Sequence, residues 1–286
     1  MKHKRVFLIT GASSGIGASV AELLLADGHI VYGAARRTDR LADLVGKGMH
    51  ALAMDVTDDE SMVAGIRKLI DREGRIDGLV NNAGYGEYGA LEETSLEKAR
   101  YQFEVNVFGL ARLTQLVLPT MRGQGSGRIV NVSSIGGRLG EPHGAWYHAT
   151  KFAVEGLSDS LRMELKQFGI DVVVIQPGAI KTEWNAIARE KLLATSGDGP
   201  YAELAQQHAA FLRQADESGQ ASEPAVVGKA IVKALLTHRP KTRYAVGGGA
   251  GAVLAVRSLL PDRWFDGLML RMIGGAGYET GVRQPV

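Results

Sequence analysis

The sequence predicts an α/β protein with a doubly wound, mainly parallel sheet between two layers of helices. Over the first 180 residues, short apolar runs alternate with segments that have helical spacing. The apolar runs are nearly continuous and lack the polar–apolar alternation of a half-exposed strand. Such runs are typical of parallel strands that helices cover on both faces.

Each predicted strand is a short apolar run bounded by turn residues. The first, VFLIT, leads directly into a glycine-rich turn, and IDVVVIQPG ends in a Pro-Gly pair. Runs of this length between turn residues are expected for buried strands. The predicted strands cover residues 6–10, 29–35, 50–56, 76–84, 127–134, 170–178 and 242–246.

The predicted helices combine helical spacing with recognisable ends. The segment 58–74 opens with acidic residues, which a helix N-terminus favours, and it closes on Gly74. The segment that starts at residue 18 likewise closes on Gly28. The predicted helices cover residues 18–28, 36–48, 58–74, 95–121, 145–167 and 223–237.

We expect one domain over residues 1–286, with an insertion and a C-terminal extension. Residues 183–222 are polar and helical in pattern, which predicts an insertion over one edge of the sheet. Residues 250–286 form the extension, and basic residues flank the apolar stretch YAVGGGAGAVLAV. Peripheral membrane contact is one reading of this tail. Its glycines disfavour a stable membrane helix, so a cap that packs on the subunit or its partner is favoured.

Composition excludes several kinds of protein. The chain has no cysteine, which rules out disulfides, thiolate metal sites and a cysteine nucleophile. The seven histidines form no HExxH pair, so no metal site is expected. A net charge of +2 without a basic, aromatic-rich tract gives no reason to expect nucleic acid. No apolar run is long enough for a signal peptide or a spanning helix, so we expect a cytoplasmic protein.

The turn after the first predicted strand reads TGASSGIG, residues 10–17. Its glycines allow a tight turn and let a phosphate approach the helix N-terminus, so we predict a dinucleotide pyrophosphate site. A turn without a ligand is the alternative. The GASSG part also matches the nucleophile elbow of serine hydrolases, but too little chain precedes it to supply the oxyanion loop of that fold.

Two arginines follow the second predicted strand, where the adenosine ribose of a dinucleotide would lie. Arg36 and Arg37 stand there, and no carboxylate occurs before Asp39. A ribose 2′-hydroxyl favours an acidic residue at this place, whereas a 2′-phosphate favours arginine. We therefore predict NADP(H) in preference to NAD(H).

The stretch AWYHATK places Tyr147 and Lys151 on one face of a predicted helix. A nearby ammonium stabilises a phenolate and lowers the tyrosine pKa toward the range of an acid–base catalyst. Ser134 ends a predicted strand and can hydrogen-bond a substrate oxygen. Asn106 lies on an otherwise apolar helical face, where it serves either a structural network or a proton relay through water to Lys151.

These motifs together resemble the short-chain dehydrogenase/reductase (SDR) family. The family's order and spacing are matched by TGASSGIG (10–17), Asp55-Val56, NNAG (81–84), Asn106, Ser134, YxxxK (147–151) and PG (177–178). The resemblance covers about residues 4–250 and is closest to the 17-beta-hydroxysteroid and retinol dehydrogenase-like branch. It implies a Rossmann-type, seven-stranded sheet, a homodimer or homotetramer, and hydride transfer between NAD(P) and an alcohol or carbonyl.

The resemblance also implies roles for single residues. The catalytic tetrad is Asn106, Ser134, Tyr147 and Lys151. The residues expected at the cofactor are Gly11, Ser13, Ser14, Gly15, Ile16, Gly17, Arg36, Arg37, Asp55, Val56, Asn82, Ala83, Gly84, Tyr147, Lys151, Pro177, Gly178, Ile180 and Thr182.

For the substrate we expect contacts from Ser134, His143, Trp146 and Trp184. The insertion offers further apolar residues at helical spacing, which are more often core than pocket. If they line a pocket, the substrate is apolar: a steroid, a retinoid or a long-chain carbonyl compound. A sensor or scaffold that binds NADP(H) without catalysis is the alternative function, and the complete tetrad favours an enzyme.

Overall fold

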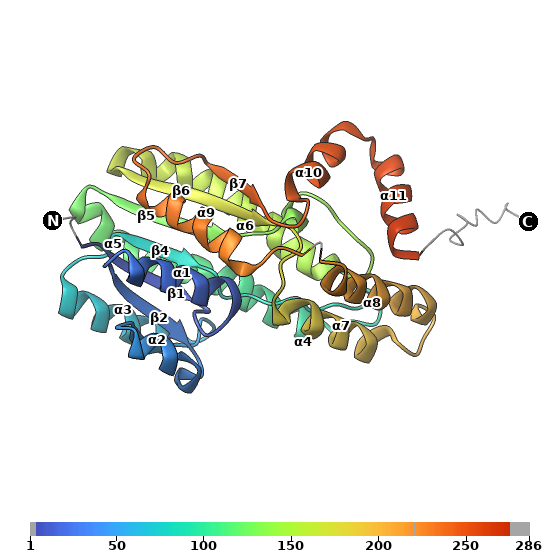
Figure 1. Cartoon of the computed structure of the whole chain (residues 1–286), viewed down its shortest axis with the longest axis horizontal. Coiled ribbons are helices and arrows are strands. Elements are labelled where there is room, and N and C mark those ends of the chain that lie inside the picture. The colour runs from blue at the N-terminus through green and yellow to red at the C-terminus, as the bar shows by residue number, and fades with distance from the viewer. Residues whose placement is uncertain (1–3, 220, 275–286) are drawn as a thin grey trace, which may run out of the picture.

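Seven parallel strands form one sheet in the computed structural model, which describes residues 4–219 and 221–274 (Figure 1). Their order is β3-β2-β1-β4-β5-β6-β7, so the order in which successive strands are added reverses between β1 and β4. The strands are β1 Val6–Thr10, β2 Ile30–Ala35, β3 His50–Ala53, β4 Gly78–Asn81, β5 Gly127–Val132, β6 Ile170–Pro177 and β7 Arg243–Val246. The predicted fold class is confirmed. Ligands of open α/β sheets bind outside the carboxyl ends of the strands at such a reversal.

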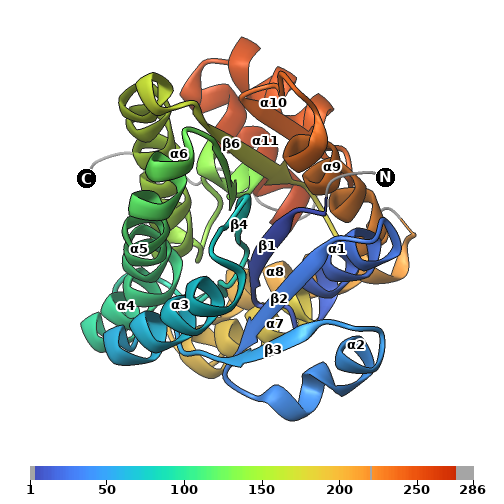
Figure 2. The same cartoon turned by 90° about the vertical axis from the view of Figure 1, so that its left-hand side faces the viewer.

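Helices cover both faces of the sheet, as Figure 2 shows. Helices α1 and α9 pack together on one face, and α3, α5 and α6 lie on the other. The helices are α1 Gly15–Ala26, α2 Ala42–Gly46, α3 Asp59–Glu73, α4 Leu96–Phe103, α5 Gly109–Gln124, α6 Ala145–Leu165, α7 Glu183–Ser196, α8 Ala202–Glu217, α9 Pro224–Leu236, α10 Ala250–Leu259 and α11 Asp262–Gly274.

The central strand β1 explains why the strands read as unbroken apolar runs. Phe7 and Ile9 pack against α1 and α9, whereas Val6 and Leu8 pack against the helices of the opposite layer. Successive side chains of a strand point to opposite faces, and here both faces are buried. Each residue of β1 therefore has to be apolar or internally hydrogen-bonded.

The helix expected over residues 95–121 contains a π-helical turn. The chain forms α4, then a π-turn over Glu104–Phe108, and then α5. A π-turn accommodates an extra residue in the helix and is often found at functional sites. Here it carries Asn106, whose buried side chain bonds to the loop after β4.

The insertion and the extension form four helices beyond the carboxyl ends of the strands (Figure 1). Helix α11 packs against α8, and Phe265 and Met269 join Leu139 in a separate apolar cluster. The tail thus lies on its own subunit as far as Gly274, and residues 275–286 lie outside the described part. Within the described residues, no helix is long and apolar enough to cross a membrane.

Candidate active site

The glycine loop between β1 and α1 depends on close approach of the backbone. Gly11 has a φ of 63°, in the left-handed region that favours glycine. A Cβ on Gly17 would lie 2.3 Å from the carbonyl oxygen of Gly11 and 2.7 Å from Nδ2 of Asn82. Gly17 therefore lets the first turn of α1 pack directly on the loop and on the end of β4.

Replacing Gly17 by alanine is expected to lower the free energy of unfolding by about 1–3 kcal/mol, because the methyl group has no space. Dinucleotide affinity should fall with it, since the loop has to move away from α1. Gly123→Ala is the matched control, because a Cβ there meets nothing within 4 Å. Urea denaturation and cofactor titration of both variants measure the difference, and equal stability of the two would contradict this role of Gly17.

Thr10 ties the glycine loop to the segment after β4. Its Oγ1 accepts hydrogen bonds from the backbone N–H groups of Asn82 (3.0 Å) and Ala83 (2.9 Å). The side chain of Asn82 in turn donates to the carbonyl oxygens of Thr10 (3.0 Å) and Gly11 (3.2 Å). These hydrogen bonds thus join the glycine loop to the segment after β4, and both were expected at the cofactor.

Of the two arginines after β2, one lines the cavity and the other does not. Arg36 lines the cavity described below, and its Nη1 donates to the hydroxyl of Tyr101 (3.2 Å). Arg37 is exposed and is not part of the cavity wall. Next to them, Asp55 also lines the cavity, and its Oδ1 accepts from the backbone N–H (2.9 Å) and hydroxyl (2.8 Å) of Thr57.

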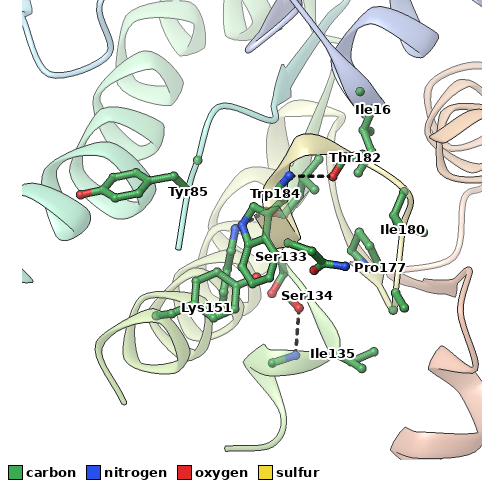
Figure 3. Close-up of a pocket in the computed structure, with 18 of the residues that line it drawn as sticks. Ile16, Tyr85, Ser133, Ser134, Ile135, Lys151, Pro177, Ile180, Thr182 and Trp184 are labelled. Carbon is green, nitrogen blue, oxygen red and sulfur yellow. Dashed lines mark hydrogen bonds between the residues drawn. The ribbon is translucent and has the colours of Figure 1, made fainter. Parts of the chain in front are cut away.

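A cavity of about 1240 Å³ runs along the carboxyl ends of the strands (Figure 3). Its wall includes every residue expected at the cofactor except Gly17 and Arg37. Figure 3 shows Ser134 from the end of β5, Lys151 from α6 and Pro177 from the end of β6 around the same space. The cavity therefore joins the glycine loop to the Tyr147–Lys151 pair.

Tyr147 lies on the first turn of α6 and is buried among aromatic rings. The centroid of its ring is 5.1 Å from that of Trp184 and 5.7 Å from that of Tyr88. Burial raises the pKa of Tyr147 above its usual value, and a side-chain hydrogen bond to Ser134 opposes this rise. The phenol is thus protonated at neutral pH, which is the form that can donate a proton.

Lys151 follows one turn later, with its Nζ 5.9 Å from the centroid of the Tyr147 ring. Nζ donates to the carbonyl oxygen of Val132 (3.0 Å). Burial lowers the pKa of Lys151 to about 8, although Glu155 opposes the change. The sequence predicts that Lys151 lowers the tyrosine pKa; in this structure burial of the phenol outweighs any such effect.

Asn106 uses both hydrogens of its Nδ2 and one lone pair of its Oδ1 in hydrogen bonds within the protein. Its Nδ2 donates to the carbonyl oxygen of Tyr85 (2.9 Å) and to Oγ1 of Thr150 (3.1 Å), and its Oδ1 accepts from the Tyr85 backbone N–H (3.1 Å). The amide thus joins the loop after β4 to α6. A Cβ on Gly84 would lie 3.0 Å from Oδ1 of Asn106 and 3.8 Å from Nζ of Lys151. Glycine therefore keeps the space between these two side chains open.

The chain that carries this glycine loop, serine, tyrosine and lysine matches a known protein family. A family model described as short chain dehydrogenase matches residues 5–193. The chain belongs to the short-chain dehydrogenase family. Membership makes this short-chain dehydrogenase an oxidoreductase with a nucleotide-binding, Rossmann-type fold. Its placement in the 17-beta-hydroxysteroid and retinol dehydrogenase-like branch stays a prediction.

Three relatives match nearly the whole short-chain dehydrogenase. A 3-ketodihydrosphingosine reductase from Bacteroides thetaiotaomicron is 37% identical over 259 residues, covering 90% of this chain and 94% of the relative. An NADPH-dependent 3-dehydrocapnine reductase from Ornithobacterium rhinotracheale is 35% identical over 277 residues, covering 92% and 95%. The crystal structure of a short-chain dehydrogenase from Streptomyces avermitilis has a TM-score of 0.79 and 40% identity, covering 90% and 93%.

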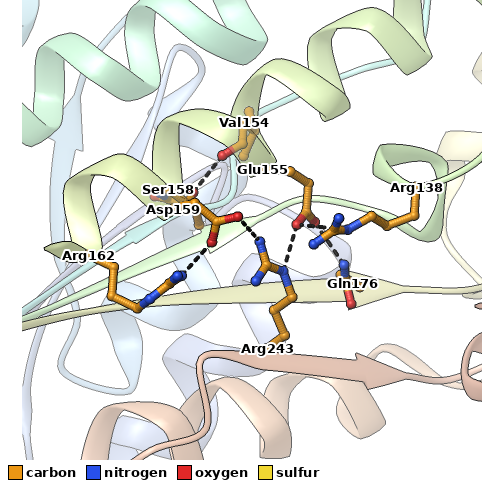
Figure 4. Close-up of polar contacts among 9 residues, drawn as sticks. Arg138, Val154, Glu155, Ser158, Asp159, Arg162, Gln176 and Arg243 are labelled. Carbon is orange, nitrogen blue, oxygen red and sulfur yellow. Dashed lines mark hydrogen bonds and ion pairs between the residues drawn. The ribbon is translucent and has the colours of Figure 1, made fainter.

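An ion-pair network holds α6 of this short-chain dehydrogenase against the sheet (Figure 4). Glu155, one turn after Lys151, accepts from Nε of Arg243 (2.9 Å) and from Nε2 of Gln176 (3.0 Å). Arg243 also donates to Asp159 (2.7 Å), so one guanidinium bridges two turns of α6. Since these partners lie on β6 and β7, the network fixes the helix that carries the tyrosine and the lysine.

Two residues expected at the substrate lie behind the cavity wall. Trp146 and Tyr147 are neighbours on α6 and their side chains point in different directions from the helix. Tyr147 lines the cavity, whereas Trp146 packs edge-to-face on Phe103, with ring centroids 6.4 Å apart. His143 has a φ of 61° and turns its Nδ1 toward Nδ1 of His208, 3.3 Å away. The structure thus brings only Ser134 and Trp184 of that set to the cavity.

The sequence did not reveal two parts of the wall. One is a polar group, Tyr88 and Glu141, beside the tyrosine. Glu141 lies in a loop and fits no motif, so no pattern marks it. The other is the C-terminal extension, whose apolar residues repeat at helical spacing and could have been assigned to the site. Its lining residues are Val253, Val256, Phe265, Leu268, Met269 and Met272.

Proposed function

We propose that this short-chain dehydrogenase reduces a ketone on a long, apolar molecule with NADPH, and that Tyr147 donates the proton. The proposal depends chiefly on one observation: the buried phenol of Tyr147, protonated at neutral pH, and the hydroxyl of Ser134 line the same cavity, which begins at the glycine loop. A sensor that binds the nucleotide without turnover would need neither the buried phenol nor the serine beside it.

The residues present fit a dinucleotide phosphate. The side chain of Ser14, the residue that precedes α1, makes no capping hydrogen bond in the described structure, so backbone N–H groups of the first turn are available to an anion. Arg36 stands where a ribose 2′-phosphate would lie, and the residues of β2 before it are uncharged. When bound, NADPH supplies the hydride to the carbonyl carbon. The NADPH-dependent relative supports this choice of cofactor.

Side chains of this protein hydrogen-bond and protonate the carbonyl oxygen of the substrate. Oγ of Ser134 accepts from the backbone N–H of Gly136 (3.0 Å), which leaves its own hydrogen for the substrate oxygen. Tyr147 transfers its proton to that oxygen as negative charge develops there. Lys151 holds the cofactor ribose. Asn106 positions a water that passes a proton toward Lys151 and so restores the phenol.

The cavity wall and the relatives favour one of the three expected substrate classes. Trp184, Leu212 and Phe265 give the cavity wall beyond the cofactor residues an apolar surface. Two relatives are named as reductases of 3-ketodihydrosphingosine and of 3-dehydrocapnine. We therefore favour a long-chain ketone over a steroid or a retinoid. NADPH consumption with a panel of long-chain ketones, steroids and retinals tests this, and cofactor binding without turnover of any of them would favour the sensor.

We further propose that the protein is a homodimer or a homotetramer. Phe108 at the start of α5 and Phe152 and Met163 on α6 are exposed large apolar side chains. Helices α5 and α6 are the long helices expected to pair between subunits. Pairing would remove these side chains from water, which favours association.

Replacing Arg36 by alanine is expected to weaken NADPH binding by about 10- to 100-fold and to leave NADH binding nearly unchanged. The reason is that a guanidinium forms charge-assisted hydrogen bonds with a phosphate dianion. Arg37→Ala is the matched control, because Arg37 lies outside the cavity wall. Titration of each variant with both cofactors gives the answer. An equal loss for NADH and NADPH, or a larger effect at Arg37, would contradict the assignment.

A further inference from the structure

Glu141 places a carboxylate in the cavity wall close to the catalytic tyrosine. Its Oε1 accepts a 2.5 Å hydrogen bond from the hydroxyl of Tyr88, whose ring packs against Tyr147. The side chain of Glu141 is 16% exposed. The carboxylate thus borders the cavity, and the side chain of Tyr88 contacts both it and the proton donor, Tyr147.

No cation among the described residues neutralises this carboxylate. The nearest basic nitrogens are Nε2 of His148 (3.8 Å) and Nε2 of His208 (4.0 Å). Both ring nitrogens of His148 already have hydrogen-bond partners: Nδ1 bonds the carbonyl oxygen of Gly136 (2.9 Å), and Nε2 accepts from the Glu141 backbone N–H (3.2 Å). Burial lowers the pKa of His208, which favours its neutral form at neutral pH.

Aromatic side chains line the same cavity as this carboxylate. The ring centroids of Tyr88 and Trp184 are 5.6 Å apart, and both side chains line the cavity with Tyr147. The faces of aromatic rings attract cations, and more strongly where water is excluded. An ionised carboxylate that a substrate covers with apolar surface would lose hydration without compensation. The site therefore disfavours a purely apolar ligand there.

We propose that Glu141 binds a cationic amine that the substrate carries close to its carbonyl group. The substrate class is then a long-chain amino ketone: the ammonium donates hydrogen bonds to the carboxylate while Ser134 and Tyr147 contact the carbonyl oxygen. Oε2 of Glu141 has no hydrogen-bond donor among the described residues and is available to the amine. This inference rests on the proposed function, since it names a further group of the same substrate.

The test compares two substrates in two proteins. A long-chain 2-amino-3-ketone and its analogue without the amine are reduced with NADPH at mildly acidic pH, where the amine is charged. We expect the wild-type kcat/KM to be about 10- to 100-fold higher for the amino ketone, as for a lost charge-assisted hydrogen bond. In Glu141→Gln the two values should agree within about threefold.

The substitution is chosen to separate recognition from structure. Glutamine keeps an oxygen that can accept from Tyr88, so a structural role alone would leave the preference for the amine unchanged. Glu190→Gln, an exposed position on α7 outside the cavity wall, is the matched control and should keep the wild-type preference. A preference that survives in Glu141→Gln overturns the inference.

A second measurement needs no variant. A long-chain primary amine should inhibit the wild-type enzyme, in competition with the ketone, at about tenfold lower concentration than the alcohol of equal length. Equal inhibition, or equal turnover of both ketones by the wild type, overturns the role of Glu141 and leaves the proposed function standing. Failure to reduce either ketone, with NADPH bound, contradicts the proposed function itself.

Discussion

Replacing Tyr147 by phenylalanine is expected to lower kcat by about 10²- to 10⁴-fold while NADPH affinity stays nearly constant. Only the hydroxyl is removed, so the contacts of the ring with Tyr88 and Trp184 are kept. The substitution removes the proton donor to the carbonyl oxygen. The raised pKa of Tyr147 keeps this phenol protonated at neutral pH. Single-turnover kinetics and cofactor titration separate the two effects.

Tyr201→Phe is the matched control for this prediction. Tyr201 lies in front of α8, and its hydroxyl donates to Glu92 on the surface (2.7 Å). Losing that hydroxyl should leave both turnover and cofactor binding unchanged. If Tyr147→Phe retained wild-type turnover, Tyr147 would not be the acid. If it lost NADPH binding as well, the ring would serve the cofactor rather than the proton transfer.

Replacing Lys151 by methionine is expected to raise the free energy of unfolding at pH 7 while it lowers activity. The pKa of Lys151 falls from 10.5 to about 8 because burial disfavours the ammonium. That shift costs about 3 kcal/mol in the wild type. Loss of the hydrogen bond to Val132 offsets about 1 kcal/mol. The expected net gain is roughly 2 kcal/mol, together with weaker cofactor binding, since the ammonium is proposed to hold the ribose.

The pH dependence of that gain follows from the direction of the shift. Between pH 8 and 10.5 the unfolded chain binds more protons at Lys151 than the folded chain, so wild-type stability rises with pH. The advantage of Lys151→Met should therefore be largest below pH 8, disappear near pH 10 and reverse slightly above it, where only the lost hydrogen bond to Val132 remains. Over the same range wild-type kcat/KM should fall, because the ammonium deprotonates.

Urea denaturation at pH 7 and pH 10 measures this change in the stability difference. Lys47→Met is the control with the opposite sign, since Glu22 raises the pKa of the exposed Lys47. It should slightly reduce stability at both pH values. A Lys151→Met protein that is less stable than the wild type at pH 7 would mean that the ammonium is better compensated than its burial indicates.

The sheet could be predicted from the sequence because its strands are buried on both faces. In a chain that alternates with helices, a short continuous apolar run such as that around Val173 fits a buried strand better than any other element. The glycine loop could be predicted for a related reason. Its backbone geometry tolerates few residues other than glycine, so the local sequence is restricted as strongly as the local structure.

The rest of the site depends on contacts between distant segments. The π-turn that carries Asn106 arises where the helix meets the loop after β4, and apolar spacing alone does not reveal it. Trp146 and Tyr147 are neighbours in the chain, yet only the tyrosine reaches the cavity. Glu141 acquires its significance from Tyr88, 53 residues away. Such pairings are decided by tertiary packing, which a single sequence does not display.

The cavity is built by two successive parts of the chain, and this arrangement has an evolutionary consequence. The glycine loop, the serine, the tyrosine and the lysine all precede α7, whereas a second group of apolar wall residues belongs to α7, α8, α10 and α11, among them Trp184, Leu212, Val253 and Phe265. Mutations in the later helices can alter the shape of the substrate space while the hydride-transfer apparatus is inherited unchanged. Duplicated copies of such a gene can thus diverge in substrate through substitutions in their last third alone.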